Sequence, residues 1–295
     1  MLTSAILNEV KRLELRTRRL VDSLMAGEYF SIFKGRGLEF YEVREYLPGD
    51  EVRAIDWKTT AKTGVPYVRA YVEEKELPVI LVVDVSGSLE FGTGGKTKAG
   101  VMVGVTAFLG MVALKRNNPL GLVAFSDTIE ILLRPTRGRK QFLNIISALL
   151  TLLSPEHKRR RGTDVNLAIN TLLRVAKRRS LVFLLSDFIA KDYELALATT
   201  CQRHDIVPVV FSDVRESILP DVRFVELQDN ETGERVTIDT SDNRLRAYFH
   251  SQAFHTKKAR EGFMMGLGMD FIDISANAPY MKPIKGFFYR RMGRR

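Results

Sequence analysis

The chain has 295 residues, 45% of them hydrophobic, which is enough to bury a sizeable core and to build two modules. Its 45 Lys and Arg against 35 Asp and Glu give a net charge of +10 and a pI near 9.7, which favours an anionic partner such as a nucleic acid, an anionic lipid or an acidic protein surface. The single cysteine, Cys201, excludes a disulfide framework and is typical of a reducing cytoplasm.

Residues 1–77 are expected to hold an N-terminal helix followed by a β segment. Helical spacing with mixed charge predicts the helix over residues 2–26, and turn signals predict short strands such as 38–44 and 67–73. The N-terminus lacks the pattern of a secretory signal, and the longest apolar stretch, 101–114, is too short to span a bilayer. We therefore expect a cytoplasmic protein without a transmembrane segment.

Residues 78–278 alternate strand and helix patterns. Strands are expected at 79–84, 120–125, 129–133, 181–186, 206–211 and 271–274, and helices at 98–115, 139–153, 164–177, 192–203 and 242–267. This alternation predicts an α/β fold with a doubly wound, mostly parallel sheet and helices on both faces. Residues 126–128 are too few for a crossover, so the strand at 129–133 should be an antiparallel edge strand.

Residues 214–241 interrupt this alternation. Two strand patterns, 222–227 and 235–239, flank a turn-rich segment and predict a β-hairpin. The hairpin could pair with the strands of residues 38–73 and form a small β module beside the sheet. Residues 279–295 are expected to form a basic C-terminal tail.

The strand at 79–84 ends in chemistry that suits a metal ion. Its apolar run leads directly into Asp84-Val85-Ser86-Gly87-Ser88, which places one carboxylate and two hydroxyls at the strand end. Oxygen ligands of this kind suit a hard divalent cation such as Mg²⁺. In the alternative interpretation, Ser86 or Ser88 only caps the next helix.

Two later segments favour the metal interpretation. Gly162-Thr163 comes directly before a predicted helix, and the strand at 181–186 ends at Asp187. The three elements in this order resemble the metal-ion-dependent adhesion site (MIDAS) of von Willebrand factor A domains. The resemblance implies Mg²⁺, or another divalent cation such as Mn²⁺ or Ca²⁺, within a set formed by Asp84, Ser86, Ser88, Thr163 and Asp187. If strands 79–84 and 181–186 are neighbours, the two carboxylates meet where the strand order reverses.

A second resemblance covers most of the chain. Residues 40–57, which include Arg44-Glu45-Tyr46-Leu47-Pro48-Gly49-Asp50 and Ile55-Asp56-Trp57, resemble the signature of the bacterial DUF58 family, and segments 229–234 and 287–291 match its pattern as well. The resemblance implies an A-type domain behind the signature, and association with a MoxR-type AAA+ ATPase. The residues themselves give no chemical role for the signature, and we expect Asp56 and Trp57 to be structural.

The loop Gly92-Thr93-Gly94-Gly95-Lys96-Thr97 is similar to a phosphate-binding loop. The Walker A pattern needs a glycine at position 90, where this chain has Glu90, so we expect no ATP hydrolysis by the chain itself. The four histidines form no Ser/His/Asp arrangement and no zinc-ligand spacing, so no catalytic residue is assigned and an enzyme is not expected.

These patterns together predict a metal-dependent protein-binding module, an adaptor or assembly factor for the ATPase. The resembled site leaves one coordination position open, and the Asp or Glu of a partner would fill it. The basic run at 158–161, directly before the Gly-Thr element, would favour an acidic client. Two alternatives remain open: a Mg²⁺-dependent hydrolase that uses Asp84 and Asp187, and a nucleic-acid or anionic-membrane binder that uses basic patches. No zinc-finger spacing or RNP-like sequence predicts specific nucleic-acid recognition.

Overall fold

The computed structural model describes residues 4–25, 42–50, 52, 55–70, 77–93, 95, 97–154, 162–228 and 234–292. The chain divides into two compact units. The smaller, called here the signature unit, is Lys34–Glu76, and the larger, called the sheet unit, joins Met1–Phe33 to Leu77–Arg295. This division differs from the expected one, because the N-terminal helix belongs with the sheet and not with the β segment that follows it.

The sheet unit is built on six strands in the order β10-β7-β6-β3-β4-β5. They are β3 (Val79–Asp84), β4 (Leu120–Phe125), β5 (Ile129–Thr136), β6 (Leu181–Ser186), β7 (Asp205–Ser212) and β10 (Ile272–Ser275). Every neighbouring pair is parallel except β4 and β5. The predicted α/β fold with one antiparallel edge strand is confirmed, and so is the pairing of β3 with β6.

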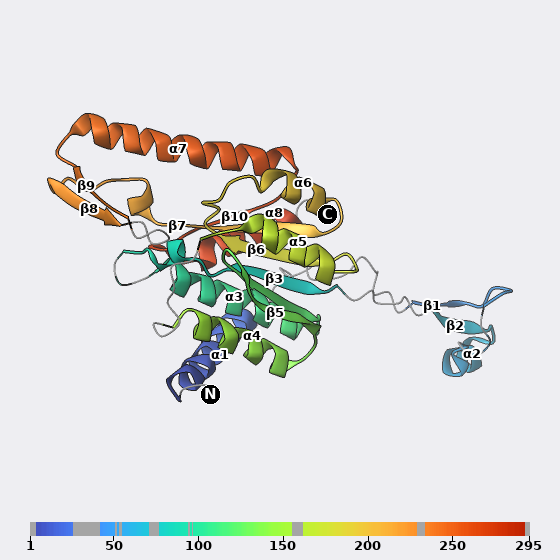
Figure 1. Ribbon diagram of the computed structural model, residues 1–295. Coiled ribbons are helices and arrows are strands. Elements are labelled where there is room, and N and C mark those ends of the chain that lie inside the picture. The colour runs from blue at the N-terminus through green and yellow to red at the C-terminus, as the bar shows by residue number, and fades with distance from the viewer. Residues whose placement is uncertain are drawn as a thin grey trace. The chain divides into compact units, whose positions relative to one another are not determined.

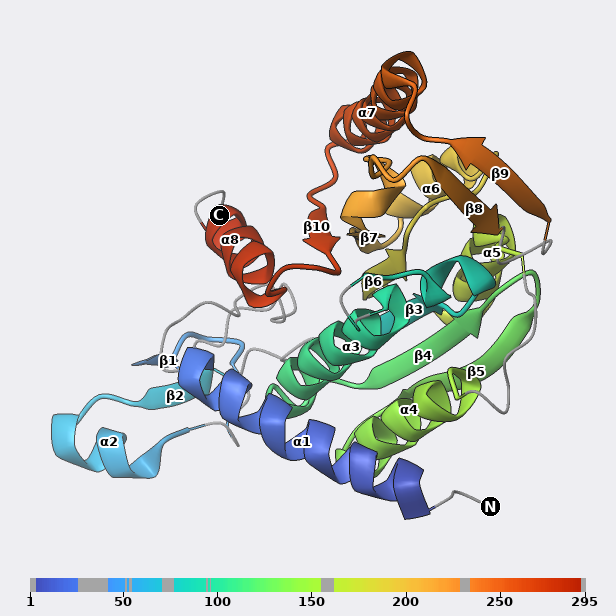
Figure 2. The same ribbon diagram turned by 90° about the vertical axis from the view of Figure 1, so that its left-hand side faces the viewer.

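Two layers of helices cover the sheet (Figures 1 and 2). On one face pack α1 (Ser4–Met25), α3 (Lys98–Lys115), α4 (Arg139–Leu152) and α8 (Met281–Met292), and on the other α5 (Val165–Val175), α6 (Glu194–Cys201) and α7 (Asn243–Gly266). Successive residues of β3 enter opposite layers: Leu81 and Val83 join the first core, and Val82 joins the second. Burial on both faces explains why the strand is continuously apolar.

Helix α3 is the central helix of the first layer and is apolar all round. It is the one helix in the described part of the chain that is long and apolar enough to cross a membrane by length and composition. Within the protein, 83% of that stretch is buried, as in the core helix of a globular domain. Gly110 lets α4 approach closely, because a Cβ there would lie 3.3 Å from the Phe142 ring.

The hairpin expected within residues 214–241 is present. Its strands, β8 (Phe224–Gln228) and β9 (Arg235–Asp239), pair antiparallel outside the main sheet, and residues 229–233 lie outside the described residues. The expected pairing with the strands of residues 38–73 is wrong among the described residues. The strands β1 (Glu42–Glu45) and β2 (Tyr67–Ala70) pair with each other instead and form a sheet of their own in the signature unit.

The expected basic tail is in large part a packed helix. Ile284, Phe287 and Phe288 of α8 have helical spacing and are buried in the first core. Arg291 lies 3.4 Å from the Asp270 carboxylate and also pairs with Asp205. Part of the basic charge of this segment is therefore used inside the sheet unit.

The signature unit gives its sequence motif a structural role. The Arg44 guanidinium donates two hydrogen bonds, of 2.8 and 2.7 Å, to the Asp50 carboxylate, which also accepts from the Leu47 N–H. This fork closes the turn and lowers the pKa of Asp50. Asp56 caps helix α2 (Trp57–Thr63) by accepting from the backbone N–H of Lys58 at 3.1 Å. Trp57, the first residue of α2, is 68% exposed.

Candidate metal-binding site at the carboxyl edge of the sheet

Asp84 is the last residue of β3 and is completely buried. One carboxylate oxygen accepts a hydrogen bond of 2.6 Å from Ser186 Oγ on β6, and the other accepts one of 2.9 Å from the Ser86 N–H. No ion pair of Asp84 occurs among the residues that the structure describes. Burial, and secondly the nearby Asp187 carboxylate, raise the pKa of Asp84 to about 7.

The two serines of the motif lie in the turn that follows β3. The Val85 N–H binds the Phe125 carbonyl, and the chain then enters the short helix η3 (Gly87–Glu90). Ser86 precedes η3, but its hydroxyl makes no capping hydrogen bond; its Oγ lies 3.0 Å from Ser88 Oγ instead. The capping interpretation therefore fails for Ser86, and the two hydroxyls form a pair of oxygen donors beside Asp84.

Thr163 lies at the same edge of the sheet, one strand away from β3. The N–H of the next residue, Asp164, binds the carbonyl of Ser126, which directly follows β4. The Asp164 carboxylate caps α5 by accepting from the Leu167 N–H at 2.9 Å. The backbone hydrogen bond of Asp164 thus holds the Gly-Thr element at the carboxyl end of β4. The basic run at 158–161 lies outside the described residues.

Asp187 follows β6 and is also buried, but its surroundings differ from those of Asp84. Its carboxylate lies 2.7 Å from the Nζ of Lys98 and accepts from the Ile189 N–H at 3.1 Å. Phe188 turns the chain with a positive φ of 56°. From the second layer, Arg260 of α7 donates to the Asp187 carbonyl at 2.9 Å. The Asp187 carboxylate, which was expected to lie beside a metal, is thus paired with the Lys98 ammonium in this structure.

Lys98 and Glu216 are the two participants that sequence reasoning did not identify. Lys98 is the first residue of α3, its exposed fraction is 0%, and its ammonium pairs with both Asp187 and Glu216. Glu216 ends the short helix η5 (Val214–Glu216), and its second oxygen accepts from the Asp213 N–H at 2.9 Å. Burial alone would lower the pKa of Lys98, but the two carboxylates outweigh it and raise that pKa.

The donor set at this edge fits a hard divalent cation. Asp84, Ser86, Ser88 and Thr163 offer only oxygen atoms, as Mg²⁺ prefers. The Lys98 ammonium pairs with two carboxylates, those of Asp187 and Glu216, and the Asp84 carboxylate lies close enough to Asp187 for the two charges to interact. The described residues contain no group of three or more His, Cys, Asp or Glu side chains placed to hold a metal. Hydroxyl oxygens would therefore have to complete the shell.

The loop that is similar to a phosphate-binding loop is held by carboxylate and hydroxyl contacts. The Thr93 hydroxyl lies 2.9 Å from an Asp213 oxygen, and the Thr93 N–H donates to the same carboxylate at 3.2 Å. Thr97 caps α3 by accepting from the Gly100 N–H. Residues 94 and 96 lie outside the described residues. A carboxylate therefore takes the backbone donor of Thr93, which a phosphate loop would direct at its anion.

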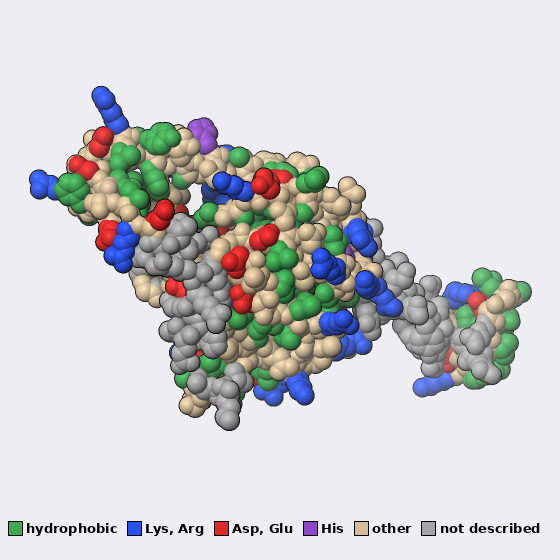
Figure 3. All heavy atoms as spheres, viewed as in Figure 1, with side chains coloured by type: hydrophobic (Ala, Val, Ile, Leu, Met, Phe, Trp, Pro, Cys, Tyr) green, Lys and Arg blue, Asp and Glu red, His purple; other side chains and the backbone are tan. Residues whose placement is uncertain are grey.

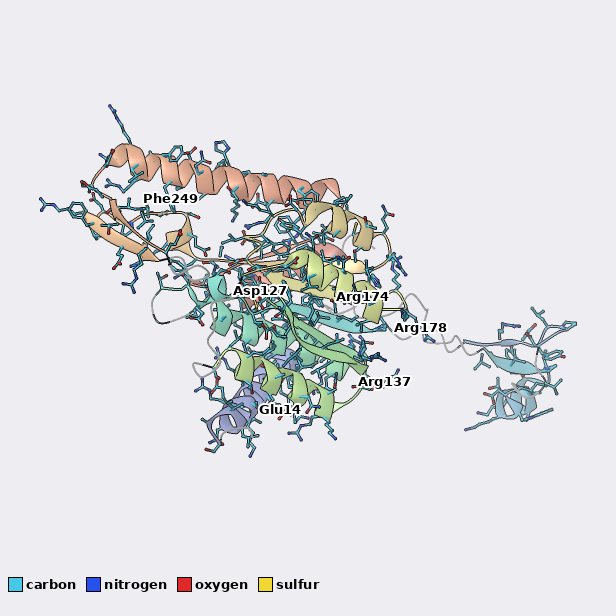
Figure 4. The ribbon with its side chains drawn as sticks, viewed as in Figure 1. Glu14, Asp127, Arg137, Arg174, Arg178 and Phe249 are labelled. Atoms are coloured by element: carbon cyan, nitrogen blue, oxygen red, sulfur yellow. The ribbon has the colours of Figure 1, made fainter. Side chains whose placement is uncertain are left out.

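Exposed basic side chains gather at the other end of the sheet unit. Arg137, Arg174 and Arg178 are labelled on the right-hand part of the sheet unit in Figure 4, where Figure 3 shows several Lys and Arg side chains. Asp127, which follows β4 at the carboxyl edge, lies away from them. The described basic cluster is thus separate from the candidate metal site.

Comparison with known proteins identifies the family. The model of the family described as "Protein of unknown function DUF58" matches residues 42–259. Uncharacterized proteins of Mycobacterium bovis and Mycobacterium tuberculosis are each 32% identical over 283 residues, which cover 96% of this chain and 88% of each relative.

Solved structures give weaker likenesses. BatB from Bacteroides thetaiotaomicron is 12% identical, with a TM-score of 0.47 over 74% of this chain and 100% of its own. An aerotolerance-related membrane protein from Bacteroides fragilis is 14% identical, with a TM-score of 0.45 over 72% of this chain and 99% of its own. The SpRpn10 VWA domain is 15% identical, with a TM-score of 0.34 over 46% of this chain and 76% of its own. On the family match and the curated relatives, the chain belongs to the DUF58 family.

Proposed function

We propose that this protein is a metal-dependent protein-binding module of the MIDAS type. The observation that carries the proposal is the state of Asp84: a fully buried carboxylate at a strand end, with a pair of serine hydroxyls beside it. A buried carboxylate without a cation is unfavourable unless something compensates its charge. A divalent cation on Asp84 would supply that compensation.

The residues of the edge have distinct roles in this proposal. Asp84 provides the charged ligand, and Ser86, Ser88 and Thr163 provide neutral oxygens for Mg²⁺, Mn²⁺ or Ca²⁺. Asp187 stays beside this shell, held by Lys98. When bound, the cation supplies one electrophilic position that an acidic side chain can fill. The protein's own part is to hold the oxygens together at the end of a rigid sheet and to leave that position free for a partner's Asp or Glu.

The partner follows from the family resemblance. We infer a MoxR-type AAA+ ATPase, an acidic client protein, or both, with this chain as adaptor or assembly factor in the cytoplasm. The proposal assigns no catalytic residue. Hydrolysis of a phosphoester by the pure chain, dependent on Mg²⁺ and lost in Asp84→Asn, would favour the alternative of a metal-dependent hydrolase.

The test combines metal binding with partner binding. Calorimetric titration of the pure chain with Mg²⁺ and Mn²⁺ should detect one site that is lost in Asp84→Asn. The matched control is Asp127→Asn, because Asp127 is an exposed acid at the same edge but outside the ligand set. Binding of the purified MoxR-type ATPase of the same cell should require the divalent cation and should fail with Asp84→Asn. Equal binding by wild type and Asp84→Asn, with metal and with chelator, would contradict the proposal.

A further inference from the structure

Lys98 is a charged side chain buried at the start of a core helix. It begins an otherwise apolar helix of the core, and the next residue, Ala99, is buried as well. An unpaired lysine in the interior is strongly unfavourable, so it is found there with carboxylate partners. Here the partners come from distant parts of the chain: Asp187 after β6, and Glu216 at the end of η5.

The Lys98 ammonium is connected to the candidate metal ligands through the side chain of Asp187. Asp187 is the neighbour in sequence of Ser186, and the Ser186 hydroxyl donates to Asp84 at 2.6 Å. The carboxylates of Asp84 and Asp187 are close enough for their charges to influence each other. A cation bound to Asp84 and the Lys98 ammonium would therefore both act on the Asp187 carboxylate.

The contacts of Glu216 hold the ammonium in place. One oxygen of Glu216 faces Lys98, and the other accepts from the Asp213 N–H, so the carboxylate is fixed by the backbone of η5. Asp213 in turn accepts from Thr93, in the segment that leads into α3. The Glu216 carboxylate and the segment that leads to Lys98 are thus both held by hydrogen bonds before any metal binds.

We propose that the Lys98 ammonium is a built-in counter-cation that sets the divalent-cation affinity of this edge. It occupies the Asp187 carboxylate and repels a second cation, so that metal binding beside Asp84 stays weak. This inference rests on the proposed metal-dependent function. The physical reason is Coulombic: removal of one positive charge at a buried site frees one carboxylate for the metal and removes one repulsion.

The test is Mn²⁺ binding by the full chain, followed through the EPR signal of free Mn²⁺. Lys98→Met should bind Mn²⁺ at least about tenfold more tightly than wild type. The double variant Lys98→Met/Asp187→Asn removes the ion pair as a neutral unit and should return to nearly the wild-type affinity. The matched control is Lys115→Met, which removes an ion-paired lysine, 2.9 Å from Asp22, at the opposite end of α3 and should leave the affinity unchanged.

The outcomes separate this inference from the proposed function. If wild type binds Mn²⁺ through Asp84 but Lys98→Met binds no more tightly, the inference is wrong and the proposed function stands. If wild type binds no Mn²⁺ but Lys98→Met does so through Asp84, the inference stands and metal dependence of the native protein fails. If neither binds, both are wrong.

Lys98→Met leaves Asp187 without its cation, so the folding of this variant is followed with and without metal. Folding only in the presence of Mn²⁺ would support the inference directly, because the metal then replaces the ammonium. If Lys98→Met does not fold even with Mn²⁺, the Glu216→Gln variant tests the inference in its place. Loss of this partly exposed carboxylate leaves the ammonium less compensated, so Mn²⁺ affinity should fall about threefold. An unchanged affinity in Glu216→Gln would overturn the inference.

Discussion

Two neighbouring strands of this sheet end at buried carboxylates on the same edge, and the two carboxylates have different partners. Val83 of β3 lies opposite Leu185 of β6, so Asp84 stands beside Ser186 and Asp187 lies one residue further along. Asp187 receives an ammonium at 2.7 Å, whereas Asp84 receives a hydroxyl and a backbone N–H. Burial is the same on both strands, and the counter-charge is different.

The difference separates a structural carboxylate from a binding carboxylate. A buried ion pair is a closed arrangement, because both charges are already compensated. A buried carboxylate that has only neutral donors keeps an uncompensated charge, which raises its pKa and leaves it ready for a cation. Ligand binding is therefore expected at Asp84. Asp187 instead takes part in the ion pairs that join α3 to η5 through Lys98.

The largest expected effect tests the Asp187 side. Asp187→Asn leaves the buried Lys98 ammonium with Glu216 as its one remaining carboxylate among the described contacts. We expect a loss of about 3 kcal/mol in the free energy of unfolding, the usual consequence of removing one partner from a buried pair. Urea unfolding of the metal-free proteins measures it. A loss below about 1 kcal/mol would mean that the ion pair contributes little, and the comparison would break.

The next effect tests the Asp84 side through pH. The pKa of Asp84 is near 7 in the folded chain, above its ordinary value of 3.8, so the folded state holds this proton more tightly than the unfolded state. In the metal-free chain, the contribution of Asp84 to the free energy of unfolding should be largest below about pH 4. It should be lost as the pH rises to about 7. The slope should reach at most about 1.4 kcal/mol per pH unit. Asp84→Asn should remove this component, which a series of urea titrations between pH 4 and 8 would reveal.

A smaller effect tests the same side through metal. At pH 8 the Asp84 carboxylate is ionised, and Mg²⁺ should stabilise the wild-type chain by about 1–3 kcal/mol as its concentration approaches a hundred times Kd. Chelator should reverse the gain. Asp187→Asn, if folded, should retain a metal response, whereas Asp84→Asn should have none. If Asp84→Asn retained the stabilisation by Mg²⁺, the metal site would have to lie elsewhere than at the end of β3.

The fold was accessible from the sequence because its signals are local. Continuous β-branched runs mark β3 and β6, and the short link at residues 126–128 forces the antiparallel edge strand. The meeting of Asp84 with the β6 edge followed from strand adjacency alone. By contrast, the packing of α8 was missed because its basic residues dominate the composition while its three apolar side chains carry the burial.

The ammonium of the site could not have been found in the same way. Lys98 begins a helix, where a lysine is ordinarily solvated, and Glu216 falls in a segment that had been assigned to the hairpin insertion. The ion pairs join three segments that are far apart in the sequence. No periodicity or spacing encodes such a contact. A single lysine at the start of a long apolar helix is the one signal that could have drawn attention to it.

The smallest effect sharpens the comparison with an ion pair that is open to solvent on one side only: the Glu14 side chain is 9% exposed, and its cation lies at the surface. Glu14 of α1 accepts from Arg139 of α4 at 2.5 and 2.8 Å, but the Arg139 side chain is 67% exposed. The hydrogen bond from Arg139 lowers the pKa of Glu14, opposite in direction to Asp84. Its contribution is therefore present above the ordinary pKa of 4.5 and is lost as pH falls.

We expect Glu14→Gln to lower the Tm by about 1–2 °C at pH 7, because solvent screens the exposed Arg139 guanidinium. At about pH 3 the difference from wild type should vanish, since the wild-type carboxylate is then losing its charge as well. Thermal unfolding by circular dichroism at the two pH values measures both. A loss of stability as large as that of Asp187→Asn, with both variants measured by thermal unfolding, would show that exposure of the cation does not distinguish the two ion pairs. The contrast drawn from Lys98 would then lose its physical basis.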